Sequence, residues 1–216
     1  MVSVELMTEA APAKRYELIG GELCLDFCNT VGGSREGIAR ENIYSYGGVV
    51  SWAEQAGLVD KSTAESLFKK AVLAPEDGAP VLARAVELRE AIYRIFFGLL
   101  QGKAPRKSDL GLLNSELARA QCRLLVGRGP EGFAWEWSCE EPGLDYPLGP
   151  IARSAADLLT DSRRLAQVRQ CKGNDCGWLF LDGSKNHSRC WCDMRDCGNR
   201  AKVRRHRLKH RHGTQT

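Results

Sequence analysis

The residues best suited to chemistry are five cysteines between positions 171 and 197. Four of them follow the pattern C-x4-C-x15-C-x4-C and are Cys171, Cys176, Cys192 and Cys197. Four thiolates suit the tetrahedral coordination of zinc, and a closed shell of sulfur leaves no position for a reactive water. The spacing therefore predicts a single structural Zn²⁺ ion.

Two alternatives remain open for the ligand set. Cys190 lies two residues before Cys192 and could replace it, although Cys192 gives both cysteine pairs the same spacing. Imidazole nitrogen is also a common zinc ligand. The four histidines of the chain all lie in the same region and are His187, His206, His210 and His212.

Basic residues dominate the segment after Cys197. At helical spacing, one stripe consists of Arg200, Arg204, Arg207 and Arg211, with Lys202, Arg205 and Lys209 beside it. Lys and Arg supply most of the non-specific affinity for nucleic acid, and arginine can also read guanine. We therefore expect these residues, together with Arg189, to contact nucleic acid. A solvated basic tail or an arginine-rich subunit contact is the alternative, and charge alone does not separate DNA from RNA.

The charge of the chain is divided between its two parts. Residues 163–216 contain 14 Lys+Arg and 4 Asp+Glu, whereas residues 1–162 contain 17 and 23. Such asymmetry favours a basic module for a polyanion attached to a mildly acidic body.

Several classes of protein are disfavoured by the sequence. The first residues lack the charge and apolar pattern of a secretory signal, and no apolar run is long enough to span a membrane. We therefore expect a cytoplasmic protein with no membrane partner, in a compartment where clustered thiols more often bind metal than form disulfides. No nucleotide-binding glycine loop and no HExxH motif is present, so no enzyme is predicted.

The elements that must position these residues are mainly helical. We predict helices over residues 49–57, 62–74, 80–100, 108–121 and 147–164, with Ser62 or Thr63, Pro80 and Ser108 at the starts of the second, third and fourth. Two hairpins are predicted, from 15–19 with 22–28 across Gly20-Gly21, and from 122–126 with 132–138. The first would place Cys24 and Cys28 on one face of a strand in a structural role.

In the second hairpin, Phe133, Trp135 and Trp137 alternate onto one face, and we expect them to pack in a core. Residues 177–191 are predicted to form a strand, a turn and a strand between the two cysteine pairs, and 199–211 a helix held by Ala201, Val203 and Leu208. The fold class expected is α+β. It combines a mainly helical N-terminal domain with two short β-hairpins, then a small treble-clef-like zinc finger with a basic C-terminal helix.

The tetrapeptide Cys197-Gly198-Asn199-Arg200 resembles the signature of the bacterial CGNR zinc-finger family, as do the C-G-W-L-F-L-D-G-S-K-N run from Cys176 and the R-x-W-C element from Arg189. Cys190 departs from the pattern, which has a basic residue there. The run G-G-E-L-C-L-D-F-C-N-T-V at 20–31 is similar to the ABATE domain that accompanies this finger. The resemblance implies a stress-induced bacterial transcription regulator.

The same resemblance implies roles for particular residues and segments. The four spaced cysteines become zinc ligands, Asn199 caps the helix and Arg200 begins its DNA-facing side. Asp26, Asn29 and Thr30 are candidates for a ligand pocket, with turn-closing hydrogen bonds as the alternative for Asn29 and Thr30. The expected segments are a tail at 1–14, a sensor domain at 15–164, the finger at 165–212 and a tail at 213–216.

These observations and the resemblance favour a zinc-dependent transcriptional regulator that binds double-stranded DNA. Its N-terminal domain is expected to sense an unknown small-molecule effector or to mediate homodimerisation. The alternatives are an RNA- or ribosome-associated zinc protein and an adaptor whose finger binds an acidic protein partner.

Overall fold

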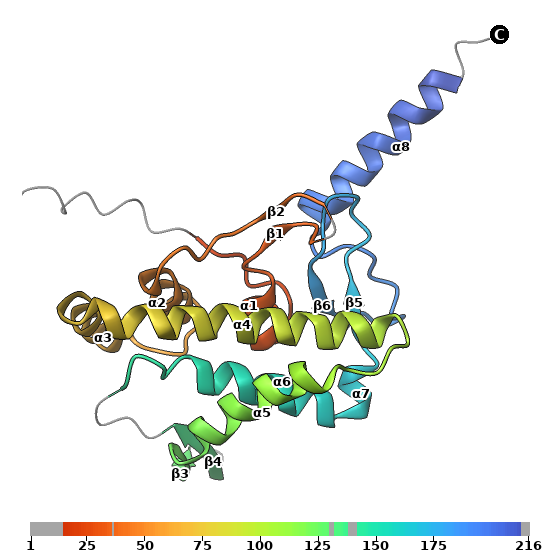
Figure 1. The fold of residues 1–216 in the computed structure, drawn as a ribbon. Coiled ribbons are helices and arrows are strands. Elements are labelled where there is room, and N and C mark those ends of the chain that lie inside the picture. The colour runs from red at the N-terminus through yellow and green to blue at the C-terminus, as the bar shows by residue number, and fades with distance from the viewer. Residues whose placement is uncertain (1–14, 36, 130–131, 138–141, 213–216) are drawn as a thin grey trace, which may run out of the picture.

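The structure, a computed structural model, describes residues 15–35, 37–129, 132–137 and 142–212, with side chains as far as Leu208. The two predicted tails, 1–14 and 213–216, and Cys139 lie outside the described residues. Where described, the chain forms a helical body, three small antiparallel sheets and a basic helix that projects from one side (Figure 1).

The helical body is built around α4 (Pro75–Leu100), with α1 (Leu23–Cys28) and α6 (Leu148–Thr160) packed against it. α5 (Lys107–Gln121) contacts both α4 and α6, and α2 (Tyr46–Gln55) and α3 (Lys61–Leu73) cover the other end of α4. The short α7 (Ser162–Leu165) follows α6. At the centre of the core, the rings of Phe27 and Trp52 lie 4.8 Å apart.

The long helix α4 confirms the predicted central core helix, because Ile92, Ile95 and Phe96 are all buried. It begins earlier than predicted, since Pro75 occupies its first turn and Pro80 lies inside it. A proline is well suited to the first turn, where its missing N–H has no helical partner. No helix among the described residues is long and apolar enough to cross a membrane.

Only some of the other helices begin with a side-chain cap, and the caps are not the predicted residues. Asp60 caps α3 by accepting the N–H of Thr63, so Ser62 and Thr63 lie inside the helix. α5 begins at Lys107 after Arg106, which makes no side-chain cap, and Ser108 is its second residue. The predicted final helix is divided at Asp161, which ends α6 and caps α7.

The first predicted hairpin is wrong, because residues 23–28 form helix α1. Gly21 does adopt a positive φ of 79°, but the turn leads into a helix. A short apolar run cannot be assigned from its periodicity alone. Here the burial of four of six residues between α4 and α6 decides the conformation.

Cys24 and Cys28 are fully buried one helical turn apart, and burial raises the pKa of the Cys28 thiol to about 12. Their predicted structural role is confirmed.

Three two-stranded antiparallel sheets complete the described fold. β1 (Gly32–Gly33) pairs with β2 (Ala39–Arg40), a pairing that was not predicted. β3 (Leu124–Gly129) and β4 (Gly132–Trp137) form the predicted second hairpin. β5 (Val168–Gln170) pairs with β6 (Leu179–Leu181) in the finger. The α+β class is therefore confirmed, with the helices concentrated before residue 166.

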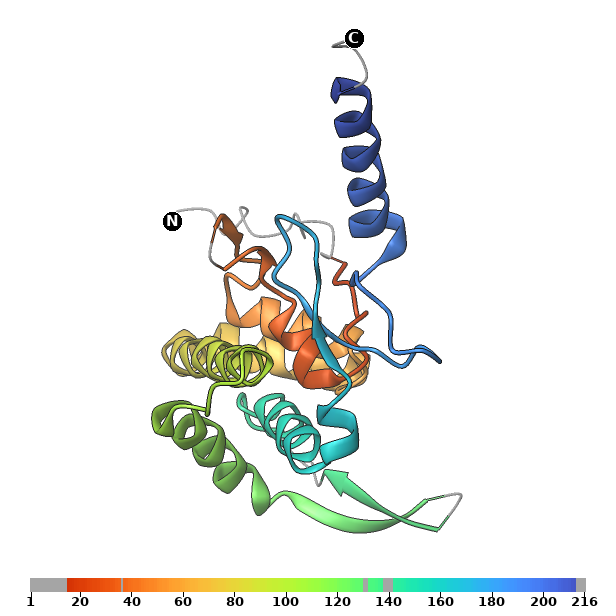
Figure 2. The ribbon, with the colours of Figure 1, turned by 90° about the vertical axis from the view of Figure 1, so that its right-hand side faces the viewer.

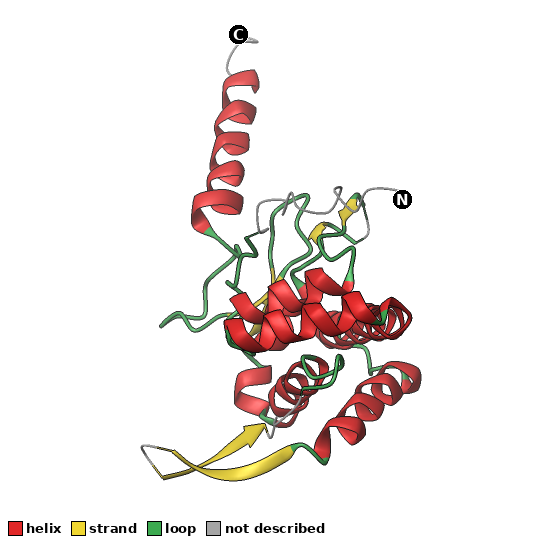
Figure 3. Cartoon of the chain, turned by 90° about the vertical axis from the view of Figure 1, so that its left-hand side faces the viewer, coloured by secondary structure: helices red, strands yellow, loops and turns green. Residues whose placement is uncertain are grey.

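The hairpin of β3 and β4, named here the arm, extends away from the helical body (Figures 2 and 3). Trp137 packs against the core at the base of the arm, as predicted. Phe133 and Trp135 do not, since they are 82% and 61% exposed. Core packing was therefore the wrong interpretation for these two residues: their alternation was correct, but the arm carries them beyond the helices.

Candidate metal centre and basic helix

The four spaced cysteines converge on one point. The Sγ atoms of Cys171, Cys176, Cys192 and Cys197 all lie within 4.8 Å of one another. The Cys176–Cys192 and Cys192–Cys197 Sγ pairs are 3.7 and 3.6 Å apart. A tetrahedral Zn²⁺ with Zn–S bonds near 2.3 Å requires sulfur atoms roughly 3.8 Å apart. The residues therefore fit one zinc ion with a closed four-sulfur shell, which would hold the finger together without exposing a reactive position.

Two backbone segments carry the sulfur atoms. Cys171 and Cys176 lie in the loop that joins β5 to β6, and Cys197 lies in a π-helical turn, Met194–Gly198, that continues into α8 (Asn199–His212). Gly173 is needed in the loop, because a Cβ there would lie 3.1 Å from the Sγ of Cys197. The last ligand thus stands at the base of the basic helix, as expected for a treble-clef-like finger.

One detail of the predicted finger is wrong. Residues 187–191 do not form a strand, and β6 pairs with β5, which precedes the first cysteine pair. Instead, the fully buried Asp182 organises this loop by accepting hydrogen bonds from Ser184 and from the N–H of Arg189. The hydrogen bonds of the Asp182 side chain thus replace the backbone hydrogen bonds that a second strand would have supplied.

Hydrogen bonds favour the thiolate form of one of the four cysteines, Cys171. The N–H groups of Gly173 and Cys192 donate to the Sγ of Cys171. Together with the thiols of Cys176 and Cys192, they lower the pKa of Cys171 and favour its thiolate. The Arg200 guanidinium lies 3.0 Å from the Sγ of Cys197 and also pairs with Asp196. A zinc ion with four thiolates carries a net charge of −2, and Arg200 offsets part of it.

The alternative ligands lie elsewhere. The thiol of Cys190 donates to the backbone oxygen of Ser188, and the backbone oxygen of Cys190 accepts from Lys172. The Nδ1 atom of His187 is hydrogen-bonded to the carbonyl of Asp182. The spacing argument that preferred Cys192 to Cys190 is therefore consistent with the geometry.

Arg189 occupies a position inside the finger. Its guanidinium donates to the carbonyl oxygens of Ile19, Trp191 and Cys192, and it lies 4.3 Å from the centre of the Phe180 ring. These contacts tie the finger to the segment before α1. We therefore leave Arg189 out of the DNA-contacting set proposed below.

The basic helix α8 presents its charges to solvent. Arg200, Lys202, Arg204, Arg205 and Arg207 are all exposed, and Figure 1 shows α8 projecting away from the body. Val203 and Leu208 were expected to hold the helix against the finger but are 49% and 50% exposed. The side chains of Lys209 and Arg211 lie outside the described part. Asn199 is not the cap: its side chain donates to Arg195, and Asp193 caps the turn that precedes α8.

The finger is firmly attached to the helical body. Val168 and Leu179 belong to the same buried core as α1 and α4. The indole N–H of Trp178 donates to the carbonyl of Val31 at 2.8 Å, and the N–H of Gly177 donates to Gly33 at 2.9 Å. The two parts therefore share a core.

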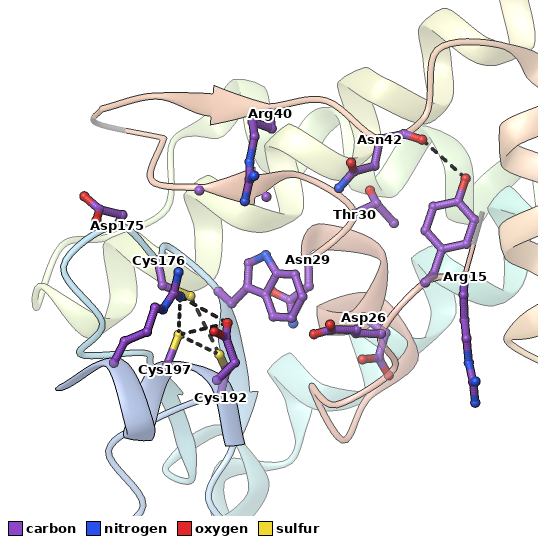
Figure 4. A pocket seen from close by; sticks show the side chains of 17 residues that line it. Arg15, Asp26, Asn29, Thr30, Arg40, Asn42, Asp175, Cys176, Cys192 and Cys197 are labelled. Carbon is purple, nitrogen blue, oxygen red and sulfur yellow. Dashed lines mark hydrogen bonds and ion pairs between the residues drawn. The ribbon is translucent and has the colours of Figure 1, made fainter. Parts of the chain in front are cut away.

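A cavity of about 300 Å³ lies between the finger and the body. Its walls include the three candidate pocket residues, Asp26, Asn29 and Thr30, and three of the cysteines, Cys176, Cys192 and Cys197 (Figure 4). The hydroxyl of Thr30 donates to the carbonyl of Phe27, as the turn-closing alternative described, whereas the amide of Asn29 bonds to the backbone of Leu179 in β6 and closes no turn. Asp26 accepts the N–H of Gly20, and burial raises the pKa of its carboxyl to about 6.

Other residues of this cavity were not found from the sequence. Arg40 and Asn42 reach it from β2 and the loop that follows, Tyr16 from the segment before α1, and Trp178 from the finger. Figure 4 shows Arg40 and Asn42 across the cavity from the cysteines. No local spacing links positions 16, 40 and 178. Only the β1–β2 pairing and the docking of the finger bring them together.

The fold and the site define a zinc-finger protein in which a helical domain carries a four-cysteine metal centre and an exposed basic helix. Two family models match the chain in this order. The ABATE model, described as "Putative stress-induced transcription regulator", matches residues 21–162, and the CGNR zinc finger model matches residues 167–210. The chain therefore belongs to the ABATE family and carries a CGNR zinc finger. A search of curated proteins finds no match.

Proposed function

We propose that this zinc-binding protein is a DNA-binding transcriptional regulator that contacts double-stranded DNA through α8. The observation that carries the proposal is the composition of this helix. Its 14 residues, N-R-A-K-V-R-R-H-R-L-K-H-R-H, include seven Lys or Arg and no acidic residue. Every side chain described from Lys202 to Leu208 is exposed. Such a helix gains stability when phosphates neutralise its charge.

The dimensions of α8 suit the major groove. A helix of 14 residues is about 21 Å long and 10–12 Å across, and the major groove of B-DNA is about 12 Å wide. α8 projects from the finger, so that its sides are free to meet DNA (Figure 3). The metal centre supports the base of the helix through Cys197. We therefore assign zinc a structural role in DNA binding and no role in catalysis.

We further propose a division of labour along the chain, with residues 15–164 as a sensor domain and 165–212 as the DNA-binding finger. The cavity between them supports this proposal because its wall contains both Asp26 of α1 and Arg200 of α8. A small molecule bound there would touch both parts at once. It could then change the position of α8 relative to the body.

The sensor role is tested by small molecules that raise the melting temperature of the zinc-loaded protein. An effector should alter DNA affinity, and Arg40→Ala should abolish its effect while leaving DNA binding without effector unchanged. Arg163→Ala, an exposed arginine on α7, is the matched control. An effector whose action survives Arg40→Ala and Asp26→Asn would place the sensing site elsewhere.

The DNA-binding role is tested by selecting genomic DNA fragments with the purified, zinc-loaded protein at several salt concentrations, with RNA as competitor. Enrichment of a common motif that survives about 150 mM salt and RNA supports a sequence-specific regulator. Binding that RNA removes would favour the RNA-associated alternative. No salt-dependent binding to either polymer would favour the protein adaptor and refute the proposal.

A further inference from the structure

The arm formed by β3 and β4 has one apolar face. In its register, Val126 is opposite Trp135 and Leu124 is opposite Trp137, with Phe133 further out on the same face. The base of this face is fixed, because Trp137 packs so closely on α6 that a Cβ at Gly149 would lie 3.0 Å from its ring. Its outer part has no cover: Val126, Trp135 and Phe133 are 61%, 61% and 82% exposed.

A groove lies between this face and the helices. It has a volume of about 620 Å³, and its walls are Leu117 and Ala120 of α5, Ala156 of α6, and Leu124, Trp135 and Trp137 of the arm. Arg153 lies over the Trp135 ring at 5.6 Å and pairs with Asp157 at the rim. The molecule thus presents a projecting apolar face and an apolar groove side by side.

We propose that two copies of this chain associate through their arms, each placing the outer apolar face of its arm in the groove of the other. A two-fold interface requires one surface to supply both complementary parts, because each residue contact then occurs twice. The arm and its groove meet this requirement.

The exposed area favours a second copy as the occupant. A fully exposed aromatic side chain offers about 150–250 Å², so Phe133 and Trp135 together leave roughly 280 Å² of apolar surface uncovered. Val126, which is 61% exposed on the same face, adds to this area. A stable interface needs about 800 Å² from each partner. Phe133 and Trp135 supply about a third of that area, and Val126 and the groove walls of the same copy supply surface for the remainder.

This inference deepens the proposed function and rests on it for one consequence only. Two joined copies would carry two α8 helices, and binding two half-sites would raise affinity for a palindromic DNA site. The association itself does not require DNA. It can therefore be measured separately, so that a failure of dimerisation and a failure of DNA binding are distinguishable.

The test is sedimentation equilibrium of the zinc-loaded full chain without DNA. The wild type should be a dimer at micromolar concentration. Phe133→Glu combined with Trp135→Glu should raise the dissociation constant of the dimer at least about 30-fold, since central aromatic residues of an interface contribute at least about 2 kcal/mol. Phe133→Glu alone tests the tip without altering the wall of the groove.

Leu73→Glu is the matched control for Phe133→Glu, because it introduces the same charge away from the arm. Leu73 lies at the end of α3 and is 84% exposed. This control should leave the dimer intact. Zinc content and circular dichroism should be unchanged in all variants. A wild type that stays monomeric, or a double variant that stays dimeric, overturns the proposal. A monomeric wild type whose arm instead binds lipid vesicles would also overturn it.

Discussion

The side-chain amide of Asn29 pairs with the backbone of Leu179 through two hydrogen bonds. Its Nδ2 donates to the carbonyl of Leu179 at 2.8 Å, and its Oδ1 accepts the N–H of Leu179 at 2.9 Å. Both residues are buried. Asn29 follows α1 in the body, and Leu179 begins β6 in the finger. The Asn29 side chain therefore makes the two backbone hydrogen bonds that a neighbouring strand would make with β6, and it joins the two parts of the chain.

Replacing Asn29 should destabilise the junction. Asn29→Ala leaves a buried N–H and a buried carbonyl without partners, and we expect the free energy of unfolding to fall by about 2–3 kcal/mol in urea denaturation. Asn29→Asp keeps the acceptor but loses the donor, so it should also be destabilising. Asn114→Ala, at an exposed position of α5, is the control and should change stability by less than about 0.5 kcal/mol. Equal effects at both positions would contradict this role.

The metal centre was predictable from the sequence because its information is local. Four cysteines at regular spacing on two short loops need no knowledge of the remaining fold, and the structure brings these four together. The same holds for the apolar repeat of α4, which identified the helix although its start was placed at Pro80 and not at Pro75. Long periodic patterns and ligand spacings can be read from the sequence because they do not depend on contacts with the rest of the fold.

Features that depend on tertiary contacts were not predictable. Residues 23–28 are a helix because α4 and α6 cover them, and Phe133 and Trp135 are exposed because the arm leaves the body. The double role of Asn29 depends on a strand 150 positions away. The segment 20–31 was correctly marked by its resemblance, but neither the resemblance nor the pattern gave the conformation or the contacts.

The zinc ion should depend on Cys197 and be independent of Cys190. Cys197→Ser removes one of four thiolates, so the protein should bind substantially less than one zinc per chain and unfold at a lower temperature, because structural zinc contributes directly to folding. Cys190→Ser is the matched control and should retain one zinc per chain. Zinc is measured by elemental analysis after dialysis against a weak chelator. Loss of zinc in the Cys190 variant would return Cys190 to the ligand set.

A buried arginine should be important for the body. The Arg89 side chain is 2% exposed and donates to both carboxylate oxygens of Glu41, at 2.8 and 2.6 Å, and to Glu90 at 3.0 Å. Arg89→Met would leave two carboxylates without their shared partner, and we expect a loss of about 3 kcal/mol in the free energy of unfolding. Arg119→Met removes an arginine that is 60% exposed and should cost less than about 1 kcal/mol. Comparable losses would show that burial of the ion pair is unimportant.

Arg204 and Arg207 should contribute to DNA affinity and not to folding. Both are exposed on α8, and alanine preserves the helix, so zinc content and melting temperature should not change in Arg204→Ala or Arg207→Ala. If each arginine contacts one phosphate, each substitution should reduce the slope of log affinity against log salt by about 0.9. Arg163→Ala removes the same charge from an exposed position on the body and should leave the slope unchanged.

A loss of affinity that is equal for all three variants would indicate that only net charge matters. Affinity unchanged in the two α8 variants would mean that DNA does not bind this helix. Since the described charges of α8 point to solvent on all sides, the salt slope is the measurement that separates the side chains in contact with phosphate from those that remain hydrated.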